Sequence, residues 1–453
     1  MKKILLILFI LSQVYGQSVN ASLTIYKDGF GLVEQPVTWN VKEGRSTIQY
    51  DRLAKGMFAD SPFLDLQNAE VHAQRLSQDI FSSSNLFHKN LGQKVELKLT
   101  GEKSISGTLL EYNSSQITIQ TKSDIKSYYR NNIDYISVKN IDGQTPQLRP
   151  FLSWDIFTKN SGMTKGTLIY LSSGFDWNAK YRMIMIDESN KATLIPEAFI
   201  KNNSGLTFSK LSLQLVEGNL NRVHHEQVAK SLQRSGNMMA YAEADMGYAA
   251  PVPQRENLGD YYIYTIPNKL DIHGKESITV RLYDAREISF KKTYLFENHE
   301  QAQREEPLTV ELKIDNTEEN NLNLPLPQGT IELYQTMKNG KLEFLGEDRL
   351  KQIPKGATAK LIAGRAFDVV GKRRVLNYDR QRKSEEASIE IKITNTKDQD
   401  ANVKIIEKIS GEWVIRDEST MYMKEDASTI YFPITVPAND EILVTYTYRK
   451  EWK

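Results

Sequence analysis

A regular alternation of apolar and polar residues runs through most of this chain and constrains its fold more than any other feature. An apolar side chain at every second position lies on one face of a β-strand, and the intervening Lys, Glu, Thr and Ser lie on the other face. Strands of this kind are typical of antiparallel sheets. We therefore predict a mainly β protein of multidomain antiparallel β-sandwiches. The alternation is clearest at residues 95–99, 211–215, 278–282, 308–314, 389–393 and 442–448.

Turn signals separate the alternating segments, whereas helical signals are short. The turns are rich in Gly, Asn and Asp, which tolerate positive φ. The two helical signals lie at residues 85–92 and 224–234, and neither could carry a domain. The absence of a long strand–helix alternation argues against a doubly wound sheet. The turn signals are Lys27-Asp28-Gly29, Asp142-Gly143, Asn203-Ser204-Gly205 and Asn339-Gly340.

Changes of pattern divide the chain into five parts. Five short strand segments between Leu91 and Val138 have a length that suits an inserted small SH3-like or Sm-like barrel. Residues 223–259 have no period of two, and we expect a flexible insertion, although their methionines leave open an adaptable contact surface. The parts are a signal peptide at 1–16, an N-terminal β region at 17–88, the small barrel at 89–144, a central β-sandwich region at 145–300 containing the insertion, and a C-terminal β-sandwich region at 301–453.

The first sixteen residues have the pattern of a secretory signal peptide. Lys2 and Lys3 precede the apolar run Ile4–Leu11, and Gly16 offers a small residue for cleavage. This run is much shorter than the ~20 apolar residues that cross a bilayer, and no later segment reaches that length. We therefore expect an exported protein, periplasmic or secreted to the cell surface, with no transmembrane segment.

Charge and composition exclude several classes of protein. The 453 residues include 58 Lys plus Arg, 57 Asp plus Glu and no Cys. A chain so close to neutral lacks the basic excess of nucleic-acid binders, and we expect no nucleic-acid partner. The barrel segment mixes lysines with acidic residues, which favours a solvated face. The absence of cysteine excludes disulfides, thiolate nucleophiles and Cys-ligated metals.

No pattern of a catalytic or metal site is complete. The histidines lack the spacing of a zinc protease. Asp398–Asn402 begins like a calcium loop, but Val403 stands at the glycine position and Ile409 at the bidentate Glu position, so we expect a hairpin turn there. Ser172-Ser173-Gly174 lacks the context of a nucleophile elbow. We assign no catalytic, metal or cofactor-binding residue and no cofactor, and the ligand stays unidentified. The histidines are His72, His88, His224, His225, His273 and His299.

Five stretches, in order, resemble a bacterial exported β-rich family of unknown function that is related to mucoidy-inhibitor-type proteins. The resemblance implies an exported β-rich protein without an agreed activity, so no catalytic residue is carried over. The chain differs from many members in lacking a long coiled-coil stretch. The stretches are Leu23–Val33, Leu168–Tyr181 with its Gly174-Phe175-Asp176-Trp177-Asn178-Ala179-Lys180-Tyr181 core, Leu215–Arg222, Leu324–Thr330, and Gly364–Val370 followed by Arg373 and Arg374.

Two of these stretches give local predictions. Trp177 and Tyr181 lie four residues apart, and we expect them to close one edge of a sandwich core at a turn entering a strand that begins at Tyr181. A sugar-stacking platform is the alternative. In the last stretch, Phe367 is expected to point inward and Asp368 outward, where Asp368 pairs with Arg373 or Arg374 in a structural ion pair.

Three functional hypotheses follow. The first is an exported non-catalytic β-sandwich protein that acts as a binding or structural module at the bacterial cell envelope, with an envelope protein or a glycan as partner. The second is a glycan-binding or carbohydrate-active protein that uses exposed aromatics, and the third is self-association through sheet edges. Burial of the rings separates the first two hypotheses. The rings in question are Trp154, Trp177, Tyr261, Tyr262 and Tyr264.

Overall fold

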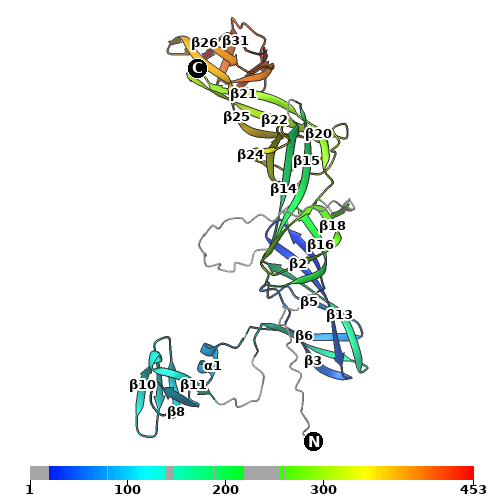
Figure 1. Cartoon of the computed structure of the whole chain (residues 1–453), viewed down its shortest axis with the longest axis vertical. Helices are drawn as coiled ribbons and strands as arrows, with labels where there is room; N and C mark the ends of the chain where they lie inside the picture. Colours follow the sequence, from blue (N-terminus) through cyan, green and yellow to red (C-terminus); the bar gives the residue numbers. More distant parts are fainter. Residues whose placement is uncertain are drawn as a thin grey trace. The chain divides into compact units, whose positions relative to one another are not determined.

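The computed structural model describes residues 20–78, 80–138, 147–186, 189–218, 255–258 and 261–452, with only the backbone given for 255–258. It confirms the predicted fold class, because the chain is mainly β and forms several sheets (Figure 1). The signal peptide, the helical signal at 224–234 and nearly all of the insertion at 223–259 lie outside the described residues. The described residues form two compact units: those within 1–22, 32–173 and 204–210 belong to unit 1, and those within 23–31, 174–203 and 211–453 belong to unit 2.

Unit 1 is built around two central strands, β13 and β12. Strand β13 pairs with β2 on one edge and with β4 and β5 on the other, while β12 lies between β3 and β6. Trp154 of β12 is fully buried and meets Trp39 edge to face at 5.9 Å. The bounds are β2 Phe30–Val41, β3 Gly44–Tyr50, β4 Gly56–Met57, β5 Phe63–Leu66, β6 Ala69–Ser77, β12 Phe151–Thr158 and β13 Gly162–Ser173.

The segment expected to be a small barrel forms a five-stranded antiparallel sheet. The strand order is β10-β9-β8-β7-β11, so the last strand returns to pair with the first and the sheet curls into a half-barrel. Helix α1 precedes it, starting after Ser82, whose hydroxyl accepts a hydrogen bond from the Asn85 N–H. Phe87 of this helix packs into the sheet's own core. The bounds are α1 Ser83–Lys89, β7 Lys94–Leu99, β8 Ile105–Tyr112, β9 Gln116–Gln120, β10 Ile125–Tyr129, η1 Arg130–Asn132 and β11 Ile133–Val138.

Unit 2 begins with two groups of strands. In the first the order is β17-β18-β16-β1, and β17 comes from the last residues of the predicted insertion. In the second the order is β19-β15-β14-β23-β24, with β20 also paired to β15. The bounds are β1 Ser22–Tyr26, β14 Phe175–Ile186, β15 Lys191–Asn202, β16 Phe208–Glu217, β17 Arg255–Leu258, β18 Tyr261–Ile272, β19 Glu276–Arg281, β20 Arg286–Ser289, β23 Gly329–Thr336 and β24 Leu342–Leu350.

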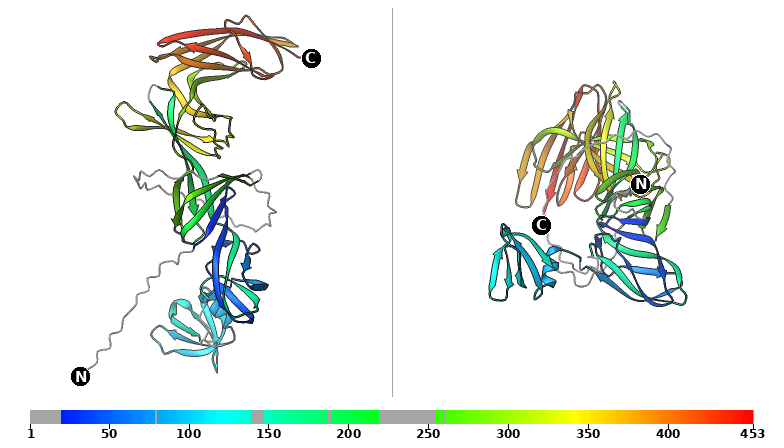
Figure 2. Two further views of the ribbon diagram at one scale, coloured as in Figure 1. Left: turned by 90° about the vertical axis from the view of Figure 1, so that its right-hand side faces the viewer. Right: turned by 60° about the horizontal axis from the view of Figure 1, so that its bottom comes forward.

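The rest of unit 2 is a nine-stranded sheet, coloured from light green to red in Figure 2. Its order is β28-β31-β26-β25-β22-β21-β27-β30-β29. Tyr446 of β31 donates a hydrogen bond to Glu407 of β27, although four strands separate them in the sheet, so the sheet folds back on itself around its core. The bounds are β21 Lys291–His299, β22 Arg304–Asp315, β25 Thr358–Arg380, β26 Ser384–Asn395, β27 Ala401–Lys408, β28 Glu412–Arg416, β29 Met423–Lys424, β30 Thr429–Val436 and β31 Asp440–Glu451.

The alternating segments of the sequence form strands as predicted. In β26, for example, Ile389, Ile391 and Ile393 are buried and the polar residues between them are not. The pairing differs from the prediction where β14 pairs with β23 and β21 pairs with β27, because the strands of these pairs run parallel. Alternation identifies the faces of a strand but not its neighbours. Within the described ranges, no helix has both the length and the apolar composition that crossing a bilayer requires.

Candidate functional site

Trp177 and Tyr181 lie inside strand β14, which begins at Phe175, so the prediction of a turn before Tyr181 is wrong. Both rings are fully buried on one face of the strand. The Trp177 Nε1–H donates to the Val216 carbonyl at 3.3 Å, and the Tyr181 hydroxyl donates to the Pro327 carbonyl at 2.7 Å. Burial raises the pKa of Tyr181 well above its ordinary value. The two rings therefore connect this stretch to two other stretches of the resemblance.

The loop from Leu324 to Gln328 receives several of these side-chain hydrogen bonds. The Tyr264 and Tyr283 hydroxyls both donate to the Pro325 carbonyl at 3.3 Å. A buried carbonyl without a partner is destabilising, and the Pro325 and Pro327 carbonyls of this loop obtain their donors from tyrosine side chains. Gly329 follows the loop, and a Cβ there would lie only 2.0 Å from the Ala179 carbonyl oxygen of β14. Only glycine permits this close strand approach.

Lys27, at the turn after β1, forms the charged part of the same cluster. Its Nζ lies 3.5 Å from a Glu217 carboxylate oxygen and donates to the Gln328 carbonyl at 2.9 Å. It also lies 4.3 Å from the centre of the Trp177 ring, in a cation–π contact. Burial lowers the pKa of Lys27, and the attraction of Glu217 opposes this effect only in part.

Four stretches of the resemblance thus meet in one place, which we call the motif cluster: Lys27, Trp177, Tyr181, Glu217 and the loop Leu324–Gln328. Glu217 accepts a hydrogen bond from the Gln328 N–H at 3.2 Å, which joins the third stretch to the fourth. The sequence identifies these stretches, but no local pattern in it pairs Lys27 with Glu217. A sequence signal was available, since Glu217 is a carboxylate directly after the apolar residues Leu215 and Val216.

The rings proposed for sugar stacking are mostly core residues. Trp154 and Trp177 are fully buried, and Tyr264 is only 2% exposed. Tyr261 and Tyr262 are half-buried neighbours on β18, and the Tyr261 ring covers Gly218, where a Cβ would lie 2.4 Å from the ring. Ile263 and Tyr264 are adjacent in β18 and both are buried, so both faces of the strand are covered at this point. These rings form no exposed platform.

The last stretch of the resemblance behaves differently from the prediction. Phe367 is 90% exposed instead of buried. Asp368 pairs with neither arginine in any ion pair between described residues, because Arg373 pairs with Glu407 at 2.8 Å and Arg374 approaches Glu390 at 3.9 Å. The error has a physical cause. Strand β25 is bulged at this point, so side chains near Phe367 do not alternate regularly between its two faces.

Arg373 and Glu407 form an ion pair that is fully buried in the nine-stranded sheet. The guanidinium contacts both Glu407 oxygens and donates to the carbonyls of Glu300 and Ala302. The Tyr446 hydroxyl donates to Glu407 at 2.6 Å, and burial raises the pKa of Tyr446 well above its ordinary value. Every charged atom of the pair therefore has a partner, as a buried charge requires.

A second group of charges, on Glu300, Glu385 and Lys450, lies beside this pair. Lys450 Nζ lies 2.8 Å from Glu300 and 3.5 Å from Glu385. Burial by itself would raise the pKa of both carboxyls, but hydrogen bonds to Glu300 from Lys450 and Ser410, and to Glu385 from Tyr448, hold their pKa values below the ordinary range. We call these three residues and the Arg373–Glu407 pair the ion network.

The remaining sequence candidates have structural roles where they are described. Asp398 and Asp400 accept hydrogen bonds from Asn439 and from the Ala438 N–H, and the expected hairpin is wrong because β26 and β27 do not pair. Ser172 is buried, and its hydroxyl donates to the next carbonyl. Among the described residues, no group of three or more His, Asp or Glu side chains is arranged to hold a metal ion.

Comparison with known proteins gives no name to these features. No protein-family model matches the chain, and a search of curated proteins finds no match.

Proposed function

We propose that this chain is an exported, non-catalytic module that binds or supports other components at the bacterial cell envelope. The signal-peptide pattern of residues 1–16 supports export. The resemblance to an exported β-rich family agrees with it. Lys27 and Arg373, which belong to the motif stretches, form ion pairs inside the fold, and this supports a non-catalytic role.

One observation carries this proposal: Lys27 and Arg373, two basic residues of these stretches, bind acidic partners inside the fold. Lys27 is held by Glu217 and a carbonyl, and Arg373 is held by Glu407 and two carbonyls. Catalytic acids and bases need access to a substrate within hydrogen-bond reach. Side chains committed to internal partners in this way stabilise a rigid body, and a rigid β-sheet body suits a module that presents binding surfaces.

The test combines an activity screen with crosslinking. The chain from Gln17 onward is purified and assayed against hydrolase and esterase substrates, and the full chain is crosslinked in intact bacteria. We expect no turnover that survives repurification and a reproducible crosslinked partner in the envelope fraction. A variant without residues 1–16 is the control, and it is expected to stay in the cytoplasm and lose the partner. Robust turnover without a crosslinked partner would overturn the proposal.

Self-association through sheet edges is tested by a separate measurement. Strands β10 and β11 form the two edges of the five-stranded sheet, and an unpaired edge can accept another strand. Light scattering during size-exclusion chromatography distinguishes the cases. A mass that rises with concentration would make the partner a second copy of the chain, whereas a constant monomer mass would leave a different envelope component.

A further inference from the structure

Phe367 is the most exposed large apolar side chain in the part of the chain that the structure describes, at 90%. It lies in a bulge of β25. Pro307 pairs with Val370 and Thr309 with Arg365, so an advance of two residues in β22 corresponds to five in β25. Bulges redirect side chains and are frequent next to functional sites.

The bulge is held firmly at both ends. The Asp368 carbonyl accepts hydrogen bonds from the Thr396 N–H at 2.9 Å and from its hydroxyl at 3.3 Å. On the other side, Gly364 has a φ of +111°, a conformation that L side chains rarely adopt. Arg365 is anchored to Glu306 at 2.9 Å. Phe367 is therefore presented to solvent by a defined backbone.

A groove of about 650 Å³ lies beside the bulge, within unit 2. Arg365 lines it, as does Lys397, which follows Thr396 in the chain. This volume is typical of sites that take a ligand or a peptide side chain. Strands β14, β22, β24 and β25, all labelled in Figure 1, contribute to its wall. The apolar part of the wall includes Met185, Phe290, Val310, Leu312 and Leu345.

The charged part of the groove is mainly basic. It contains Lys292, Arg365 and Lys397 against the single carboxylate of Asp398. Among the described residues, neither lysine forms an ion pair; Lys397 Nζ donates to the Tyr294 hydroxyl at 3.1 Å, and Lys292 Nζ lies 5.4 Å from the Tyr294 ring centre. Two ammonium groups without a carboxylate partner favour a ligand that carries negative charge.

We propose that this groove and Phe367 bind an extended segment of a partner envelope protein, in which apolar side chains alternate with acidic ones. The apolar side chains would enter the groove and pack against Phe367, and the carboxylates would approach Lys292 and Lys397. Aromatic anchors that become buried near the centre of an interface contribute much of its binding energy. A peptide is favoured over an anionic lipid surface because the apolar part is concave. The inference rests on the proposed function, which supplies the binding role.

The first experiment measures the chemistry of the ligand directly. A library of random twelve-residue peptides is displayed and selected on the full chain, and the same library is selected on Phe367→Ala. We expect enrichment of Asp or Glu alternating with Leu or Phe, and about tenfold weaker binding of the selected peptides to Phe367→Ala, as for loss of an aromatic anchor. Met421→Ala, which removes another exposed side chain, is the matched control and is expected to bind normally.

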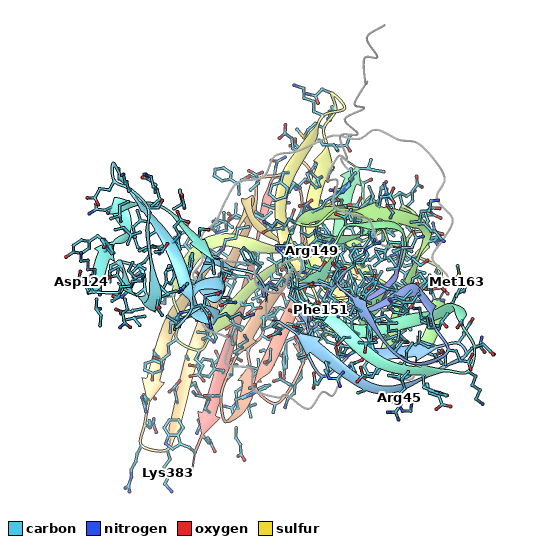
Figure 3. The ribbon with its side chains drawn as sticks, turned by 90° about the horizontal axis from the view of Figure 1, so that it is seen from below. Arg45, Asp124, Arg149, Phe151, Met163 and Lys383 are labelled. Carbon is cyan, nitrogen blue, oxygen red and sulfur yellow. The ribbon has the colours of Figure 1, made fainter. Side chains whose placement is uncertain are left out.

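The second set of variants tests the charges. Lys292→Glu, alone and together with Lys397→Gln, is expected to weaken the selected peptides about tenfold. Lys383, which is labelled in Figure 3, lies in the turn between β25 and β26, and Lys383→Glu should have no effect on binding. Thermal melting verifies that each variant is folded. Selection of basic or uncharged peptides, equal binding to Phe367→Ala, or preferential binding to phosphatidylglycerol vesicles would each overturn the inference.

The final experiment separates failure of this inference from failure of the proposed function. The photo-crosslinker p-benzoylphenylalanine is placed at position 367 or at position 421 in the full chain, and envelope proteins are crosslinked in intact cells. We expect a product only from position 367, joined to a segment with net negative charge. A product only from position 421 would overturn the inference about the groove, but the proposed binding function would stand. The absence of a product from either position, together with measured turnover, would overturn the inference and the proposed function.

Discussion

Two ion pairs in this chain, Arg373–Glu407 and Lys27–Glu217, differ in how completely their charges are enclosed. Both side chains of the first pair are 0% exposed, whereas Lys27 is 18% and Glu217 is 6% exposed. Arg373 reaches two carboxylate oxygens and two carbonyls with a planar guanidinium, while Lys27 offers a single ammonium to one carboxylate, one carbonyl and one ring. Arginine suits the buried site because its fork of donors has fixed geometry.

This comparison shows two ways in which a β protein tolerates an internal charge. In the nine-stranded sheet the charge is fully paired and dry, and removal of one partner leaves the other without compensation. At the motif cluster the ammonium keeps some contact with water, so its loss is expected to cost less. The difference between the two regions can be tested by single substitutions.

The largest effect is expected when the dry pair is broken. Arg373→Met leaves Glu407 buried with the Tyr446 hydroxyl as its one remaining donor among the described residues, and we expect a loss of about 3–5 kcal/mol of unfolding free energy. The measurement is hydrogen exchange of β25, β27 and β31, which reports this region separately. Arg374→Met, one residue away and exposed, is the control and is expected to change little.

A double substitution tests the cause of that loss. If the cost arises from an uncompensated charge, Arg373→Met combined with Glu407→Met should be less destabilising than Arg373→Met alone. This explanation would be contradicted if the double variant lost at least as much unfolding free energy as the two single variants lose in sum. Such a result would attribute the loss to packing alone.

The Lys27 pair should be more tolerant. In Lys27→Met the Glu217 carboxylate keeps the Gln328 N–H, and we expect a loss of about 1–2 kcal/mol, close to that of one hydrogen bond to a charged group. Asp28→Asn, at the exposed neighbouring position, is the control. Urea unfolding followed by tryptophan fluorescence measures the change, since Trp177 lies against Lys27. A loss as large as that of Arg373→Met would remove the distinction between the two regions.

Acid should weaken the part of the ion network that Glu300, Glu385 and Lys450 form. The pKa values of Glu300 and Glu385 are held below the ordinary value in the folded chain, so both contribute stability above about pH 4.3, the unfolded value. That contribution is lost as the pH falls through their lowered folded-state values. We expect faster hydrogen exchange at residues 299–303 and in β31 below about pH 4.3, after correction for the intrinsic rate. Glu300→Gln should reduce this pH dependence, whereas Glu412→Gln should not.

Much of this fold follows from the sequence, but the two ion pairs do not. Period-two alternation predicted the faces of β26 and β31, because each buried Ile or Tyr is separated from the next by one polar residue. Arg373 and Glu407 lie 34 residues apart, and Lys27 and Glu217 much farther, so their pairing depends on strand order. Strand order is set by tertiary packing, which a local pattern does not contain.

The error at Phe367 has a related origin. The prediction placed Phe367 inward because it assumed the alternation of a regular strand. At the bulge, however, β25 has more residues than the segment of β22 that lies opposite it. The glycine at 364, with positive φ, was the available signal that the strand is not regular at this point. The groove could not be predicted, because Met185, Leu345 and Lys397 meet only in the folded chain.

The smallest effect is expected at an exposed pair whose charged atoms lie closer together than those of the two internal pairs. Lys392 Nζ lies 2.6 Å from Glu441, closer than either internal pair, but the side chains are 42% and 54% exposed. Water already solvates both charges, so Lys392→Met should change the unfolding free energy by less than about 0.5 kcal/mol. Urea unfolding at 0.05 M and 0.5 M salt provides the measurement. A loss near that of Lys27→Met would mean that distance, and not enclosure, governs the strength of ion pairs in these sheets.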